Sequence, residues 1–200
     1  MNRLLLFLRI LIPATALSSL PTCAQKPGPA LSLAVFNQGV AVPYTRLFTK
    51  PLHPGVQIDL EWTYGRGRHS RVLQSAGIGY YFHRHLAHGL YAGTALGYEY
   101  RTGSGLSASA RLGLGYLRTL SAETTYTLVD GTYRPGRNAG TGHLMPSVSV
   151  DAGWYLRPKD PASARLFLRY QSWIEYPFAP GFIPFLSHVN LMAGLTFHPF

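Results

Sequence analysis

A strict alternation of polar and apolar residues is the feature that most constrains the fold of this chain. The alternation is clearest in residues 56–64, Val-Gln-Ile-Asp-Leu-Glu-Trp-Thr-Tyr, where every even position is apolar or aromatic and every odd position is polar. Because successive side chains of a β-strand point to opposite faces, this period of two predicts a strand with two unlike faces. Seven further segments show the pattern, at about residues 30–35, 72–83, 90–101, 106–117, 147–157, 165–176 and 189–198.

The content of the two faces predicts which face points outward. One face carries large apolar residues, while the other carries glycines, five of the eight acids and five arginines. Eight strands enclose a space barely wide enough for side chains, so we expect the large residues outside and the charges inside, paired with one another. The predicted fold is all-β, an eight-stranded antiparallel transmembrane β-barrel. Its predicted lumen network consists of Asp59, Glu61, Glu99, Arg101, Arg111, Asp151, Arg157, Arg165, Arg169 and Glu175.

Composition excludes several other classes of protein. Charged residues make up only 13% of the chain, against about 25% in soluble proteins. The 26 aromatic residues argue against disorder, and a single cysteine excludes a disulfide scaffold. The residues form no recognisable catalytic, cofactor-binding or metal-binding motif, so we expect no catalysis, no cofactor and no metal.

The N-terminus predicts export from the cytoplasm. We interpret residues 1–24 as a secretory signal peptide, because a positive start and a short apolar stretch precede small residues at Thr22 and Ala24. The barrel domain would then span residues 25–200. Lipidation of Cys23 is an alternative. With 18 Lys and Arg against 8 acids, the chain favours anionic phosphate surfaces, but an exported protein is not expected to bind nucleic acid.

The lengths of the connections predict the orientation of the barrel. Counted from the first strand, the odd connections are mostly long and the even ones short, an asymmetry typical of transmembrane barrels. We therefore expect both termini in the periplasm and the long loops outside the cell. Outward aromatic residues then fall at two heights, as amphipathic rings do at membrane interfaces. These predicted girdles are Trp62, Tyr64, Tyr98, Tyr100, Trp154 and Phe197 near the periplasm, and Tyr80, Phe82, Tyr116 and Tyr176 near the outside.

Two outer loops carry further features. Asp130-Gly131 lies between short β-like segments and is typical of a two-residue hairpin, so the third loop is predicted to contain extra strands. In the second loop, His83, His85 and His88 have a spacing that would allow them to surround a metal ion. An ordinary polar loop is the interpretation we prefer, because that loop contains no carboxylate.

Residues 190–200 resemble the C-terminal strand of bacterial outer-membrane β-barrels, which alternates and closes on phenylalanine, although Pro199 interrupts the alternation here. In that family the barrel assembly machinery recognises this strand. The resemblance implies an assembly signal at Gly194, Phe197 and Phe200. It also implies an outer-membrane location in a Gram-negative cell, in contact with membrane lipid and lipopolysaccharide. Gln25 after the cleavage site is similar to exported proteins of Bacteroidota.

Lipid A deacylases resemble this chain in size, strand number and terminal phenylalanine. Their catalytic histidine stands two residues before the serine on the outward face, but here Tyr170 stands two residues before Ser172. A serine without a base is a weak nucleophile, and His188 on the last strand is the nearest candidate base. We therefore predict a structural or cell-surface binding role. A lipid-modifying hydrolase and a soluble secreted ligand-binding barrel are the alternatives.

Overall fold

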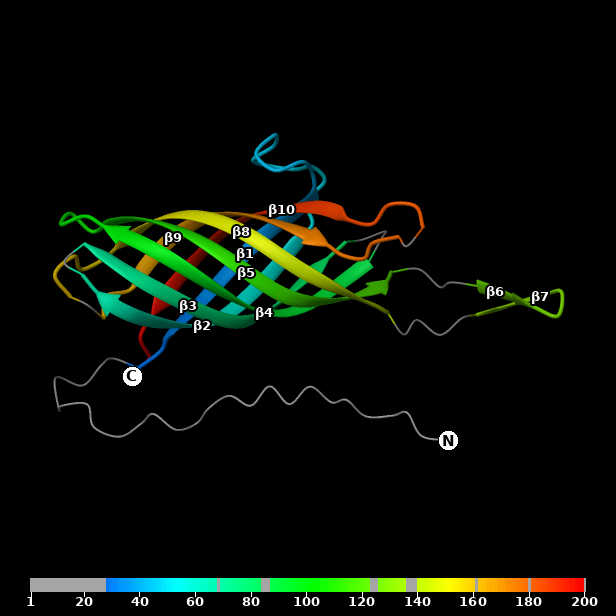
Figure 1. Ribbon diagram of the computed structural model, residues 1–200, viewed down its shortest axis with the longest axis horizontal. Coiled ribbons are helices and arrows are strands. Elements are labelled where there is room, and N and C mark those ends of the chain that lie inside the picture. Colours follow the sequence, from blue (N-terminus) through cyan, green and yellow to red (C-terminus); the bar gives the residue numbers. More distant parts are fainter. Residues whose placement is uncertain are drawn as a thin grey trace, which may run out of the picture.

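A closed barrel of eight antiparallel strands forms the body of the molecule, and a separate two-stranded hairpin extends beyond one end (Figure 1). The computed structural model describes residues 28–199 except 68, 84–86, 123–125, 136–139, 161 and 180. The predicted signal peptide, Cys23 and Phe200 lie outside the described residues. The strands are β1 (Ala30–Val40), β2 (Pro54–Arg66), β3 (Ser70–Phe82), β4 (Ala87–Arg101), β5 (Leu106–Ser121), β6 (Tyr126–Val129), β7 (Thr132–Pro135), β8 (Thr141–Tyr155), β9 (Arg165–Glu175) and β10 (Leu186–Phe197).

The first and last barrel strands pair with each other and close the sheet. The register runs from Leu31 opposite Phe197 to Val40 opposite His188. Around the barrel the order is β1-β10-β9-β8-β5-β4-β3-β2, so no barrel strand is left as an open edge. The predicted fold, an eight-stranded antiparallel barrel, is confirmed. The ladders extend past the predicted limits at the loop end, where for example Thr119 still pairs with Thr141.

Strands β6 and β7 form the hairpin predicted in the third loop. Asp130 and Gly131 both have positive φ, 51° and 73°. Two central residues with positive φ match the twist of paired strands, which explains why Asp-Gly serves here. The described part of the chain contains no helix with the length and apolar character needed to cross a bilayer.

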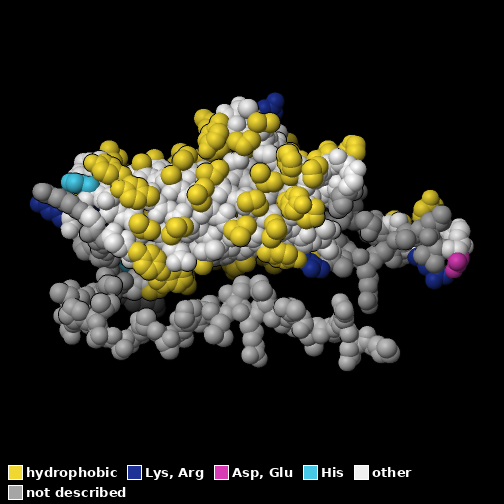
Figure 2. All heavy atoms as spheres, viewed as in Figure 1, with side chains coloured by type: hydrophobic (Ala, Val, Ile, Leu, Met, Phe, Trp, Pro, Cys, Tyr) yellow, Lys and Arg dark blue, Asp and Glu magenta, His cyan; other side chains and the backbone are white. Residues whose placement is uncertain are grey.

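The outer wall of the barrel is apolar, and the charged side chains of the barrel strands are mostly buried in its interior. Figure 2 shows hydrophobic side chains spread over the wall, with basic residues near its ends and on a loop that projects from its side. Outward residues such as Leu112 and Trp154 are 71% and 60% exposed, while inward residues such as Glu99 and Arg165 are almost fully buried. This is the reverse of a soluble barrel, in which the apolar face forms the core.

The strand register gathers the outward aromatic side chains at the two ends of the wall. Tyr64 and Tyr98 both pair with Val72, which places them in one row beside the short turns. At the opposite end, Tyr116 pairs with Leu144, which also bridges to Tyr176. Trp62 and Phe197 are partly covered, and the other eight predicted girdle residues are exposed. The outward aromatic side chains therefore lie in two groups, one near each end of the wall.

Leu168→Arg should destabilise the barrel in a lipid bilayer by about 2–4 kcal/mol, the cost of an arginine near the bilayer midplane of a barrel. Leu168 is exposed on the wall within β9, so the substitution removes no core contact. Urea unfolding from liposomes measures the effect. Leu156→Arg, in the turn beyond β8, is the matched control and should cost much less. Equal stability of the two variants would show that the wall does not face lipid.

Candidate functional site in the barrel lumen

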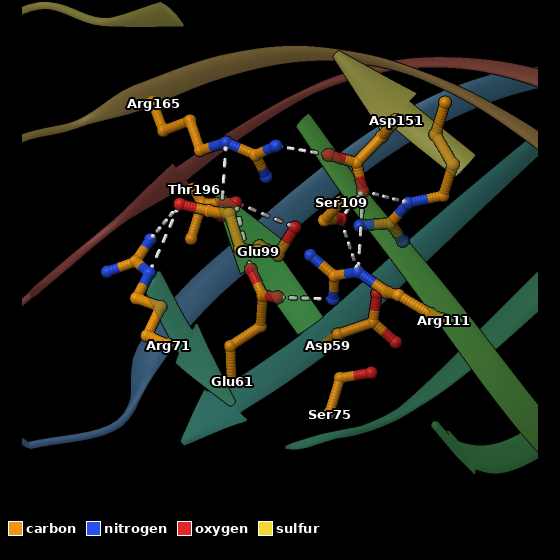
Figure 3. Close-up of polar contacts among 12 residues, drawn as sticks. Asp59, Glu61, Arg71, Ser75, Glu99, Ser109, Arg111, Asp151, Arg165 and Thr196 are labelled. Carbon is orange, nitrogen blue, oxygen red and sulfur yellow. Dashed lines mark hydrogen bonds and ion pairs between the residues drawn. The ribbon is translucent and has the colours of Figure 1, made fainter. Parts of the chain in front are cut away.

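Most of the acidic and basic side chains on barrel strands meet inside the half of the barrel nearer the short turns. They come from inward positions on β2, β3, β4, β5, β8 and β9, and the alternation of each strand directs them to the same space (Figure 3). The cluster, here called the lumen network, contains four acids, Asp59, Glu61, Glu99 and Asp151, and four arginines, Arg71, Arg111, Arg165 and Arg169. Its formal charges therefore balance.

Asp151 is the centre of the lumen network. The register places it opposite Ser109 on β5 and Arg169 on β9. Its carboxylate pairs with Arg165, with Arg111 Nε at 3.4 Å and with Arg169 Nε at 3.3 Å. The Ser109 hydroxyl also donates to this carboxylate, at 2.7 Å. One buried carboxylate thus holds guanidinium groups from two neighbouring strands (Figure 3).

Glu61 and Glu99 extend the lumen network on either side. Glu61 pairs with Arg111 and accepts a hydrogen bond from the Thr196 hydroxyl at 3.1 Å. Glu99 accepts from Arg71 Nη2 at 2.9 Å and from the Tyr155 hydroxyl at 2.9 Å. Because a buried charge is costly unless it is paired, this set of mutual contacts keeps the charged interior folded.

Asp59 lies inward as predicted but has a different partner. Gln57 Nε2 donates to its two oxygens at 3.0 and 2.7 Å, and the Tyr91 hydroxyl donates to Gln57 at 2.7 Å. A pocket of about 50 Å³ adjoins Asp59, Arg111 and Arg169, enough for a few water molecules. The lumen is filled at this level by side chains.

Three of the ten predicted lumen residues, Arg157, Arg101 and Glu175, lie outside the lumen network. Arg157 is exposed, because β8 ends at Tyr155 and the chain then turns away from the barrel axis. The prediction for Arg157 is therefore wrong. Arg101 lies at the rim, where its guanidinium lies 3.9 Å from the centroid of the Tyr155 ring and donates to the Pro158 carbonyl at 2.5 Å. The prediction omitted Arg71. Arg71 stands four residues before the inward Ser75 on β3, and residues an even number apart on a strand point to the same face.

The half of the lumen nearer the long loops is filled by apolar and aromatic side chains. Sequence reasoning expected no such group inside the barrel. Glycines on the same face make room for these rings, since a Cβ at Gly79 would overlap Tyr91 and one at Gly89 would overlap Tyr81. The buried cluster consists of Ala34, Phe36, Tyr81, Tyr91, Leu117, Met145, Phe167, Trp173 and Met192. Of these, Phe167 extends the cluster into the charged half, because it lies between Arg165 and Arg169 on β9, with its ring centroid 4.7 Å from the Arg169 guanidinium.

Glu175 closes this aromatic half rather than joining the lumen network. It lies 3.1 Å from His143 Nε2 and 3.0 Å from His188 Nε2, and all three side chains are buried. The His188 ring stacks on Trp173, with ring centroids 4.0 Å apart. Neither histidine was predicted to lie inside the barrel, because His143 falls in a segment assigned to the third loop and His188 was considered only as a base for Ser172.

The residues considered for catalysis do not assemble. Ser172 pairs with Val189 and lies on the outward face, whereas His188 pairs with Trp173 and points into the lumen. The wall of the barrel therefore separates the serine from the histidine.

The residues considered for metal binding do not assemble either. His83 stacks on His53 at 3.4 Å between centroids, and His88 lies 2.6 Å from the Tyr80 hydroxyl. His85 lies outside the described residues, and the described part of the chain contains no group of three metal ligands.

Neither the family models nor the curated proteins include a match to this chain. Among solved structures, Neisserial surface protein A has 10% identity and a TM-score of 0.48, covering 85% of this chain and 95% of that one. Ail, the attachment invasion locus protein of Yersinia pestis, has 11% identity and a TM-score of 0.48, covering 86% and 99%. The outer membrane enzyme PagL has 13% identity and a TM-score of 0.47, covering 82% and 97%. Activities do not transfer at these identities.

Asp151→Asn should lower the free energy of unfolding by about 3–5 kcal/mol, because it leaves buried guanidinium groups without their counter-charge. Adding Arg169→Met should restore part of the loss, since Arg169 has its only ion pair within the described residues with Asp151. Adding Arg111→Met instead should not, because Glu61 would then lose its partner. Urea unfolding of the single and double variants gives these energies. If Asp151→Asn left the free energy of unfolding unchanged, water would have to screen the lumen charges.

Proposed function

We propose that this chain is an outer-membrane β-barrel protein of a Gram-negative cell, with a structural or binding role at the cell surface and no catalysis. The inside-out wall carries the proposal, because an apolar exterior around a charge-balanced interior is stable in lipid and unstable in water. The barrel strands have 11 to 16 residues, enough for the 9–11 or so that a tilted strand needs to cross a bilayer.

The connections support an orientation with the hairpin outside the cell. The ends of β1 and β10 that are nearest the termini lie at the end of the barrel with the short β2–β3 and β4–β5 turns. Placing this end in the periplasm leaves the three longest connections outside, namely β1–β2, β9–β10 and the β5–β8 connection that contains β6 and β7. A signal peptide at residues 1–24 and a source among the Bacteroidota belong to the same proposal.

The last strand supports insertion by the barrel assembly machinery. Gly194 and Phe197 lie in β10, the strand that closes the barrel against β1. Recognition of this strand would bring the machinery to the site where the barrel must close.

A lumen filled by side chains supports a function carried by the loops. The lumen network and the aromatic cluster fill the interior, and the hairpin extends past the barrel mouth (Figure 1). Tyr126 and Tyr133 on the hairpin are 63% and 71% exposed, and exposed tyrosines are favoured anchors in protein interfaces. This arrangement suits adhesion or binding better than transport.

An epitope inserted at Asp130-Gly131 should be labelled on intact cells that express the protein, because the proposal places this turn outside. An epitope at Gly103-Ser104, in the β4–β5 turn, is the matched control and should be labelled only after the outer membrane is permeabilised. The parent protein should fractionate with the outer membrane and migrate differently on gels before and after heating. Recovery of the protein in a soluble fraction would favour a secreted ligand-binding barrel instead.

The purified barrel should give no steady conductance in a planar bilayer, since side chains fill both halves of its lumen. An open porin in the same bilayer serves as the positive control. Lipid A extracted from cells with and without the protein should have the same mass, and Ser172→Ala should change nothing. Steady conductance would contradict a lumen filled by side chains. Lipid A that lacks an acyl chain only in cells with the protein would support the hydrolase alternative.

A further inference from the structure

The connection between β1 and β2, residues 41–53 and here called the side loop, lies against the outside of the barrel wall. Its Tyr44 amide donates to the Tyr170 hydroxyl at 3.0 Å, and the two tyrosine rings lie 5.3 Å apart. Asn37 Nδ2 donates to the Thr49 carbonyl at 2.8 Å. Asn37 and Tyr170 occupy outward positions of β1 and β9. The loop therefore projects from the side of the barrel and not from its mouth (Figure 1).

The side loop exposes apolar and basic side chains together. Arg46 and Lys50 are exposed, and the loop contains no acidic residue. Figure 2 shows hydrophobic and basic atoms side by side on this projection. Apolar and aromatic residues next to cations are typical of segments that lie in the interface of an anionic membrane. The exposed apolar side chains of the loop are Val42, Tyr44, Leu47, Phe48 and Leu52.

A groove of about 1050 Å³ runs along the wall, lined almost wholly by apolar side chains of β1, β2, β5, β8, β9 and β10. Ala193 and Ala152 lie on either side of Leu168 in the register, and these small residues make the wall concave there. The loop's anchors, Asn37 and Tyr170, lie two residues beyond Val35 and Leu168 on the same strands. The side loop is thus anchored next to the groove.

We propose that the groove and the side loop together bind one phosphorylated membrane lipid. An acyl chain would lie along Ala193 and Ala152, and the phosphate of the headgroup would contact Arg46 and Lys50. Charge decides the occupant, since the side loop carries two cations and no acid, and these match an anionic headgroup on a hydrocarbon chain. The Arg46 carbonyl accepts a hydrogen bond from the Tyr170 hydroxyl, two residues beyond Leu168 of the groove, so the loop is attached next to the groove. The site rests on the proposed membrane location but not on the adhesive role.

The test measures lipid retention by native mass spectrometry of the detergent-purified protein, with phosphatidic acid and the diacylglycerol of the same acyl chains as probes. The parent should retain phosphatidic acid preferentially. The variant Arg46→Gln/Lys50→Gln should reduce that preference by about twenty-five-fold, because each cation near lipid phosphate contributes roughly fivefold. The matched control Arg157→Gln/Lys159→Gln removes two exposed cations from the β8–β9 turn and should change nothing.

A second pair of variants tests the groove. Ala193→Trp fills it and should reduce the retention of both lipids, whereas Ala92→Trp, exposed on β4 away from the groove, should not. Heat-modifiable gel migration first establishes that each variant is folded. The proposal is overturned if the Arg46 and Lys50 variant retains lipid as the parent does, if the turn variant loses it equally, or if a lipid-free dimer occupies the groove. Failure of outer-membrane fractionation would instead refute the membrane location itself.

Discussion

The pairing of charges inside a narrow barrel is the constraint on which the rest of this structure depends. With lipid proposed outside, inward positions are the only strand positions where a charge can be neutralised, and the alternation directs Asp151, Arg111, Arg165 and Arg169 to the same space. Such pairs do not stabilise a fold more than apolar packing would, but a broken pair is costly. They therefore oppose a shift of any strand out of register.

The lumen is divided into two parts with different chemistry. Charges fill the half nearer the short turns, and aromatic rings fill the half nearer the loops, with glycines such as Gly79 and Gly89 providing the room. The His143, Glu175 and His188 contacts cover the aromatic half. A barrel filled in this way offers no path through its centre, so a binding role must use its loops or its wall.

The wall of the barrel is not uniform. On β8, β9 and β10 small residues interrupt the bulky ones, and the side loop, attached at the outward Tyr170, projects from the side of the wall. The hairpin of β6 and β7, by contrast, extends away from the barrel. The proposed lipid site and the proposed surface contacts therefore use different loops, and each can be tested without disturbing the other.

The sequence by itself determined the eight strands, the direction of most side chains and the Asp-Gly hairpin, because alternation and turn chemistry are local properties of the chain. It placed Asp151 and Arg165 inside the barrel without their partners. The tertiary structure decided which arginines meet Asp151, since partner choice depends on the stagger between strands that lie far apart in the chain. It also decided that β8 ends before Arg157, that rings fill half of the lumen and that the side loop is attached to the wall at Asn37 and Tyr170. These outcomes follow from the space left by neighbouring strands, which a local pattern does not encode.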